Sequence, residues 1–187
     1  MLPSAAPTRI GPAHLPGAHT RGGNAMGRTR AGLLDGAFRA FAEQGVRHST
    51  MQSIAAAAGV AKGTLYNHFR TKDDVTAALL AAELERLAAT AAALPVPEAL
   101  ATLSDGLGAH PVLRRLAETE PDVLTSLVAM SPESWAAVVE RLAAALGVDG
   151  ESAELAARWL LGIVLQPGRS TVRHRHALRL AALMTAD

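Results

Sequence analysis

A run of polar side chains without a carboxylate is the part of the sequence best suited to chemistry. Residues 62–68 read Lys-Gly-Thr-Leu-Tyr-Asn-His. On a short helix the polar residues of this run face outward, and the side chains at the start of this face are small. A lysine ammonium can donate to guanine and an asparagine amide can bind adenine in the DNA major groove, while hydroxyl groups and lysines bind phosphates. The run therefore predicts a helix that reads duplex DNA.

Two short helices and a glycine turn are the elements that must position this run. Ser49 and Gln52 have the spacing of a capping box ahead of a helix from about Met51 to Ala58. Gly59 ends that helix, and the next helix runs from about residue 61 or 62 to His68. Two helices joined by about three residues centred on glycine are expected in a helix-turn-helix.

Apolar residues at helical spacing predict the small core of this unit. Leu34, Phe38 and Phe41 mark a first helix from about residue 28, which should stop at Gly45 in a left-handed conformation. Packed against it we expect Ile54, Ala55, Ala58, Val60, Leu65 and Phe69. Thr71 and Asp74 repeat the capping pattern and begin a long fourth helix that stops before Pro95.

Charge is distributed unevenly along the chain, although its formal net charge is only +1. Residues 1–72 carry nine basic and two acidic side chains, a net charge of +7, whereas residues 73–187 carry nine basic and fifteen acidic, a net charge of −6. A basic head on an acidic body indicates that the head, and not the body, meets a polyanion.

Composition favours helix and excludes several classes of site. The 187 residues are 49% hydrophobic and only 3% aromatic, with alanine the commonest type and no cysteine. We therefore expect an all-α protein without disulfides, thiolate zinc sites or cysteine nucleophiles. No glycine-rich phosphate loop, His-Glu-x-x-His, Gly-x-Ser-x-Gly or di-iron pattern occurs, so we expect no enzyme, no cofactor and no metal site.

Three regions follow from these patterns. Residues 1–27 are rich in proline, glycine and alanine and predict a disordered tail, with Met26 as an alternative natural start. Residues 28–72 predict the helix-turn-helix domain, and residues 73–187 a helical bundle for ligand binding and dimerisation. No apolar run is long enough for a membrane span and no secretory signal is present, so we expect a cytoplasmic protein that does not bind membranes.

The residues of the head resemble a known family. Ser49-Thr50, Ile54-Ala55, Ala58-Gly59-Val60 and the segment from Lys62 to Phe69, followed by Thr71-Lys72-Asp73, look like the DNA-binding domain of TetR-family transcriptional regulators. The resemblance covers about a quarter of the chain and is dense. It implies a homodimer that binds an inverted-repeat operator in double-stranded DNA, most often as a repressor, and that an unknown small-molecule effector releases.

The resemblance also implies roles for individual residues. Base-contact candidates are Gln52, Lys62, Gly63, Thr64 and Asn67. The resemblance implies phosphate contacts by Tyr66, His68 and Lys72, and the free N–H groups at the start of the second helix add Ser49 and Thr50 as phosphate-contact candidates. Tyr66 can equally pack on the first helix, and His68 can equally bond a carbonyl at the edge of the core.

Beyond Pro95 the sequence predicts six helices and carries no motif. Their expected bounds are 97–107, 111–119, 121–130, 132–146, 150–165 and 170–184, with proline at or near the first turn of four of them. Apolar stripes on the last two predict the dimer interface, unless they only complete the monomer core: Leu155, Trp159, Ile163, Ala177, Leu180, Ala181 and Met184.

The prediction of a ligand pocket in the body rests only on the types of residue present there. Its candidate lining is Leu103, Leu107, His110, Leu113, Arg114, Leu127, Met130, Trp135 and Trp159. Each of these residues can instead be ordinary core. His174 and His176 do not face the same way on a helix, so the basic stretch around them predicts a solvated face. The remaining alternative function is a helical adaptor whose head binds protein.

Overall fold

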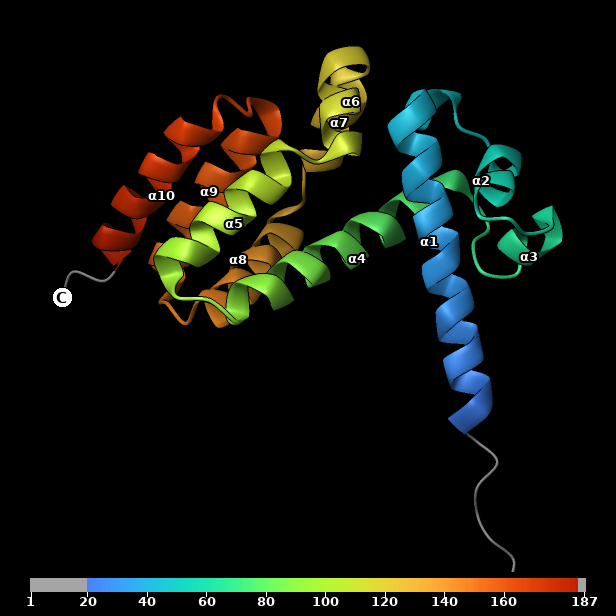
Figure 1. Cartoon of the computed structure of the whole chain (residues 1–187), viewed down its shortest axis with the longest axis horizontal. Helices are drawn as coiled ribbons and strands as arrows, with labels where there is room; N and C mark the ends of the chain where they lie inside the picture. Colours follow the sequence, from blue (N-terminus) through green and yellow to red (C-terminus); the bar gives the residue numbers. More distant parts are fainter. Residues whose placement is uncertain (1–19, 185–187) are drawn as a thin grey trace, which may run out of the picture.

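The computed structural model describes residues 20–184, with side chains from Thr29 onward. In this part of the chain every regular element is an α-helix and no strand occurs, which confirms the predicted fold class (Figure 1). No helix in it is long and apolar enough to cross a membrane. Residues 1–19 of the predicted tail lie outside the described residues.

The first three helices form the head. They are α1 (Thr20–His48), α2 (Met51–Ala57) and α3 (Lys62–Tyr66). Helix α1 begins at Thr20, so the prediction of disorder up to residue 27 was wrong for residues 20–27. The last proline before the helix is Pro16, and the Gly22-Gly23 pair that suggested a loop lowers helix propensity without forbidding helix.

The predicted stop at Gly45 is confirmed, but the predicted cap of α2 was wrong by one residue. Gly45 has a φ of +81° and interrupts the helical geometry of α1 before its last turn. The N-cap of α2 is Thr50, whose hydroxyl accepts from the Ser53 N–H at 3.0 Å while Ser53 returns a bond to the Thr50 N–H. Ser49 is unable to cap because its hydroxyl is buried and donates to the Gly45 carbonyl at 2.7 Å.

Helix α4 (Lys72–Ala92) links the head to the rest of the molecule. The predicted capping box is present: the Thr71 hydroxyl accepts from the Asp74 N–H, and the Asp74 carboxylate accepts from the Thr71 N–H. Two carboxylates, Asp73 and Asp74, lie in its first turn, where they stabilise the positive end of the helix dipole. The helix crosses α1 and runs into the body (Figure 1).

The remaining helices follow the predicted order closely. They are α5 (Val96–Gly108), α6 (Pro111–Thr119), α7 (Pro121–Val128), α8 (Pro132–Leu146), α9 (Gly150–Leu165) and α10 (Ser170–Met184). Proline occupies the first or second position of α5 to α8, where its missing N–H costs no helical hydrogen bond. The largest difference is at α7, which ends at Val128 rather than Met130.

Two separate hydrophobic cores fill the described part of the chain, and they do not coincide with the boundary predicted at residue 72. The first core joins the head to α6 and α7, because Val112, Leu116 and Leu124 are buried together with Leu33, Phe41 and Leu65. The second core joins the C-terminal half of α4 to α5, α8, α9 and α10. Helices α6 and α7 stand between the body and α1 (Figure 1). The first core therefore includes residues of two helices that the sequence assigned to the body.

Most of the stripe predicted for dimerisation lies in the second core. Ile163, Ala177, Leu180 and Ala181 are buried there, and Trp159 and Met184 pack against it. Leu155 is the member that stays exposed, with 48% of its surface accessible. The close packing of α5 against α10 uses the small residues that had suggested contact between subunits.

A pair of glycines on α1 tests the contact between the first two helices. A Cβ at Gly36 would lie 2.6 Å from backbone atoms of Ala58, whereas a Cβ at Gly32 would meet nothing within 4 Å. We expect Gly36→Ala to lower the free energy of unfolding by about 1–3 kcal/mol, because the two helices must move apart. Gly32→Ala should raise it by about 0.5–1 kcal/mol through helix propensity. Urea denaturation of both variants measures the difference, and equal effects would contradict the packing described.

Candidate nucleic-acid interface

The turn between α2 and α3 fixes the position of the third helix. Gly59 has a φ of +69°, a conformation that side chains other than glycine rarely adopt. The Gly59 and Val60 N–H groups bond the carbonyls of Ala56 and Ala55 at 3.0 Å, which closes the end of α2. On the inner side of α3, Leu65 is fully buried, and Phe69 is buried just beyond the helix. One side of α3 is therefore held against α1 and α2.

The other side of α3 carries the predicted DNA-reading residues. Lys62, Gly63 and Asn67 are exposed, and Thr64 is half-buried. A Cβ at Gly63 would meet nothing within 4 Å, so this face is open as well as small. Gln52 is exposed on α2. All five base-contact candidates thus have some surface available to a duplex.

Tyr66 and His68 are arranged differently from each other. Tyr66 is 45% exposed, and its ring lies under the Lys62 ammonium at 5.6 Å. This cation–π contact holds two candidate DNA ligands together on the outer face of α3. His68 is half-buried with its ring 6.4 Å from that of Phe69. Tyr66 is not among the residues of the first core.

The predicted phosphate contacts divide into available and occupied groups. Thr50 is exposed at the start of α2. Ser49 is only 1% exposed, so its hydroxyl is removed from the candidate contacts. Lys72 is half-buried, and its ammonium donates to the carbonyls of Val46 at 2.6 Å and Arg47 at 3.1 Å. Lys72 therefore caps the end of α1, whatever else it binds.

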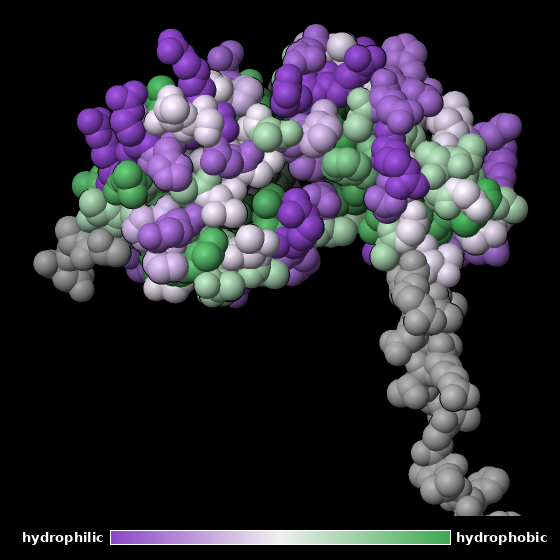
Figure 2. Space-filling model, viewed as in Figure 1, coloured by the Kyte–Doolittle hydropathy of each residue, from purple (hydrophilic) through white to green (hydrophobic). Residues whose placement is uncertain are grey.

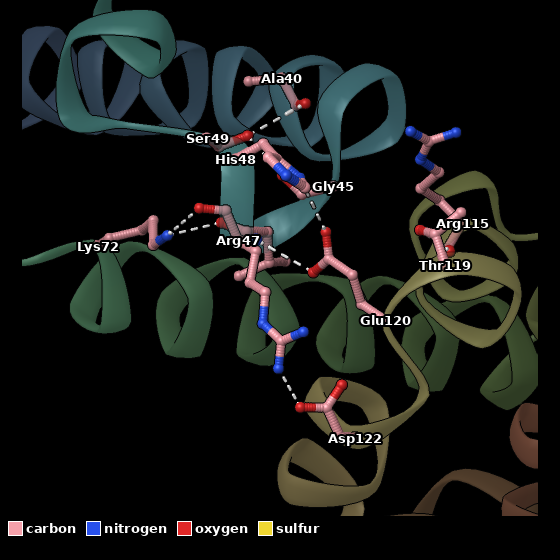
Figure 3. A network of polar contacts seen from close by, with 11 residues as sticks. Ala40, Gly45, Arg47, His48, Ser49, Lys72, Arg115, Thr119, Glu120 and Asp122 are labelled. Carbon is pink, nitrogen blue, oxygen red and sulfur yellow. Dashed lines mark hydrogen bonds and ion pairs between the residues drawn. The ribbon is translucent and has the colours of Figure 1, made fainter.

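A carboxylate from the junction of α6 and α7 also holds the end of α1 (Figure 3). Glu120 is 2% exposed, and its Oε2 accepts from the Arg47 N–H at 3.0 Å. Its Oε1 lies so close to Gly45 that any side chain there would collide with it. Arg47 in turn pairs with Asp122. Sequence reasoning missed Glu120, and the available signal was weak: a carboxylate between two predicted helices, directly before Pro121.

The structure does not bring the predicted ligand-pocket residues together. Leu103 and Leu107 belong to the second core, and Leu113 and Leu127 belong to the first. The others are scattered: Arg114 and Met130 are exposed, and Trp135 and Trp159 are half-buried on α8 and α9. The prediction failed because helical spacing shows which residues are apolar on one face, but not which of two cores receives that face.

Of the predicted pocket residues, His110 lies in a groove that the structure does contain. The groove has a volume of about 710 Å³ and is bordered by α1, α4, the end of α5 and the start of α6. The surface is hollowed between the body and α1 (Figure 2). His110 contacts the edge of the Phe38 ring, with ring centroids 5.4 Å apart. Burial lowers the pKa of His110, partly opposed by Glu83.

The fold and this surface define a helix-turn-helix protein: an exposed, carboxylate-free helix on a small head, attached to a helical body. Residues 33–79 match the family model described as bacterial regulatory proteins, tetR family. The solved structure of the TetR family repressor AlkX from Dietzia sp. strain DQ12-45-1b is similar in fold, with a TM-score of 0.62 at 20% identity over 83% of this chain and 94% of that chain. Residues 33–79 therefore form a DNA-binding domain of the tetR family type.

Two curated relatives show how far the sequence similarity extends. The chain is 32% identical over 123 residues to the HTH-type transcriptional repressor Rv1474c of Mycobacterium tuberculosis (strain ATCC 25618 / H37Rv), covering 60% of this chain and 64% of that protein. It is 43% identical over 58 residues to the HTH-type transcriptional repressor KstR2 of Rhodococcus jostii (strain RHA1), covering 31% of this chain and 28% of that protein. The matched region thus spans less than two thirds of either relative.

Removal of the Glu120 carboxylate tests how the end of α1 is held. We expect Glu120→Ala to lower the free energy of unfolding by about 1–3 kcal/mol, because the Arg47 N–H, in a partly buried hydrogen bond, loses its acceptor. Glu120→Gln keeps a carbonyl oxygen and should cost less. The measurements are urea denaturation and hydrogen exchange of the Arg47 amide, whose protection should fall in Glu120→Ala.

Glu118→Ala is the matched control for this test. Glu118 lies in the last turn of α6, two residues before Glu120, and is exposed with an ion pair to Arg114. Its removal should change stability by less than about 0.5 kcal/mol. A Glu120→Ala variant as stable as Glu118→Ala would show that the α1 end does not depend on this carboxylate.

Proposed function

We propose that the chain is a transcriptional repressor that binds an inverted-repeat operator in duplex DNA as a homodimer and is released by a small molecule. The observation that carries the proposal is the outer face of α3, where Lys62, Gly63 and Asn67 are exposed without a neighbouring carboxylate. The repressors to which the matched region is similar support the choice of repression.

The electrostatics of the head favour DNA over protein as its partner. From Ser49 to Lys72 the chain has no aspartate or glutamate, and it contributes Lys62, Arg70 and Lys72. Duplex DNA of any sequence attracts such a surface, because basic side chains that neutralise its phosphates release the counterions bound there. The Lys62 ammonium, held near the Tyr66 ring, can reach either a base edge or a phosphate.

A single head reads too few base pairs for a specific operator. Helix α3 has only five residues, and Asn67 forms its C-cap. Two such heads about one turn of DNA apart (~34 Å) would read an inverted repeat. The exposed leucines of the last two helices, Leu155 on α9 and Leu178 and Leu183 on α10, supply apolar surface for pairing two copies. We therefore place the dimer interface on the outer sides of α9 and α10.

Release by a small molecule needs a path from the body to the head. Helix α4 contributes to both hydrophobic cores, with Val75 and Leu79 in the first and Leu87 and Ala91 in the second. A ligand that binds one arrangement of the cores better than another would shift the position of α4 and the spacing of the two heads. Repression and release then use the same helix.

Substitution of Lys62 tests sequence reading. An operator is first selected from a pool of random duplexes with the full chain. On that operator we expect Lys62→Ala to lower affinity by about 5- to 150-fold, equivalent to ~1–3 kcal/mol. The ratio of the affinity for the operator to the affinity for unrelated duplex DNA should also fall. Arg141→Ala, on exposed Arg141 of α8, should change neither. Mobility shifts at several salt concentrations provide both numbers.

The salt dependence separates DNA binding from an adaptor function. Affinity for the operator should fall steeply with salt, and Lys62→Ala should lower the slope of that dependence only if Lys62 contacts a phosphate. If no duplex is enriched in the selection, or if binding does not depend on salt, the operator-binding proposal is wrong and a protein-binding head takes its place. Lys72→Ala is unsuitable as the sole test, because it also removes the cap of α1.

A charge placed on the outer leucines tests the dimer. We expect Leu155→Glu combined with Leu178→Glu to convert a dimer into a monomer, since both side chains are exposed within one chain and need no repacking there. Sedimentation velocity measures the oligomeric state, and operator affinity should fall with it. Leu94→Glu, at an exposed leucine between α4 and α5, is the control. A double variant that remains dimeric would place the interface elsewhere.

A further inference from the structure

The groove between head and body is lined by apolar residues of the first core and, on the side of the body, by Gly106 of α5. Its apolar walls come from Leu34 and Phe38 of α1 and from Leu79 and Ala82 of α4. His110, at the start of α6, lines it as well, and the cavity volume is about 710 Å³. Helices α1 and α4 cross beside it (Figure 1). A molecule bound here would contact the head and the body at once.

The imidazole of His110 has a donor without an acceptor. His110 is 92% buried, with 8% of its surface exposed, and its Nδ1 accepts from the Leu113 N–H at 3.3 Å. Because Nδ1 is an acceptor, the proton of the neutral ring is on Nε2. Nε2 is buried and makes no hydrogen bond, and the nearest carboxylate oxygen, Oε2 of Glu83, lies 3.5 Å away.

Burial lowers the pKa of His110, which keeps the ring neutral at pH 7 and its Nε2 a donor. A buried donor without an acceptor is unfavourable, and a ligand that supplies an acceptor recovers that loss. The His110 ring contacts Phe38, and its Nε2 donor lies near Glu83; both of these residues line the groove.

The charged side chains around the groove already have partners. Glu83 accepts from Arg86 at 2.8 Å and 3.1 Å, and Asp35 pairs with Arg39. The Arg30 guanidinium lies over the Phe69 ring at 5.4 Å. The two arginines and two carboxylates that line the groove cancel in formal charge. A charged ligand would have to separate one of these pairs, whereas an uncharged one would not.

We propose that this groove is the effector site and that it binds an uncharged, mainly apolar molecule with one hydrogen-bond-accepting oxygen, which accepts from Nε2 of His110. The proposal deepens the release by a small molecule proposed above and rests on it for its biological meaning. Binding itself is independent of DNA, so the two proposals can fail separately. The walls of the groove supply the apolar contact and His110 the single polar contact, as is usual for small-molecule sites.

The experiment compares three head groups on one apolar chain. The full chain without DNA is titrated with 2-octanone, octanoate and octylammonium, and the Cε1–H signal of His110 is followed by NMR. His110→Asn identifies that signal by its loss, and asparagine retains an oxygen that caps α6. We expect 2-octanone to give a saturable shift at concentrations at least tenfold lower than either charged probe.

Two variants decide between this site and others. Ala82→Phe fills the groove without removing a polar group and should weaken 2-octanone binding at least tenfold, while Ala137→Phe, on exposed Ala137 of α8, should not. In His110→Asn, calorimetry should show that the preference for the ketone over octanoate is lost. A saturable shift that is equal for octanoate, or binding that survives Ala82→Phe, would overturn the proposal, as would the absence of any saturable shift.

Operator binding is measured separately with the same probes. If 2-octanone binds the groove and lowers operator affinity, both proposals stand. If it binds without changing operator affinity, the site stands as a ligand site but its assignment as the effector site is overturned.

Discussion

The end of α1 is held by charged groups that belong to other helices, and the rest of the structure depends on this arrangement. Gly45 breaks the helical geometry, so the carbonyls and N–H groups of the last turn need partners from outside the helix. Lys72 of α4 provides donors for two carbonyls, and Glu120 provides an acceptor for the Arg47 N–H. Helix α2 begins three residues after α1 ends, so its position is set by these same contacts.

This arrangement explains why the core of the head is shared with α6 and α7. Helices α6 and α7 add Val112, Leu116 and Leu124 to the core of the helix-turn-helix unit, and Glu120 lies at their junction. The apolar and the polar contacts therefore join the same two parts of the chain. A displacement of α6 relative to α1 would disturb both at once, and packed interfaces of this kind move between discrete arrangements rather than deforming gradually.

Local signals in the sequence were sufficient for the helices but not for their assembly. Proline at the start of α6, α7 and α8 and the Thr71–Asp74 capping box fix helix ends through contacts a few residues apart, and these predictions are confirmed. The Ser49–Gln52 box failed because Thr50 and Ser53 have the same spacing one residue later, and burial of Ser49 decides between them. Glu120 and the groove depend on residues more than 70 positions apart, for which no local pattern exists.

Because α3 is short, the junction between the head and the body is important for the proposed operator binding. A helix of five residues contacts few bases, so in the proposed repressor operator affinity would come from two heads held at a fixed separation rather than from one head alone. The separation of two heads depends on the angle between each head and its body, which α4 and the contacts of Glu120 and Lys72 set. In such a dimer, a small rotation at that junction displaces α3 by an amount that grows with the distance of α3 from the dimer interface. In the proposed mechanism, a ligand bound in the groove between α1 and α4 would change this angle and with it the spacing of the two heads.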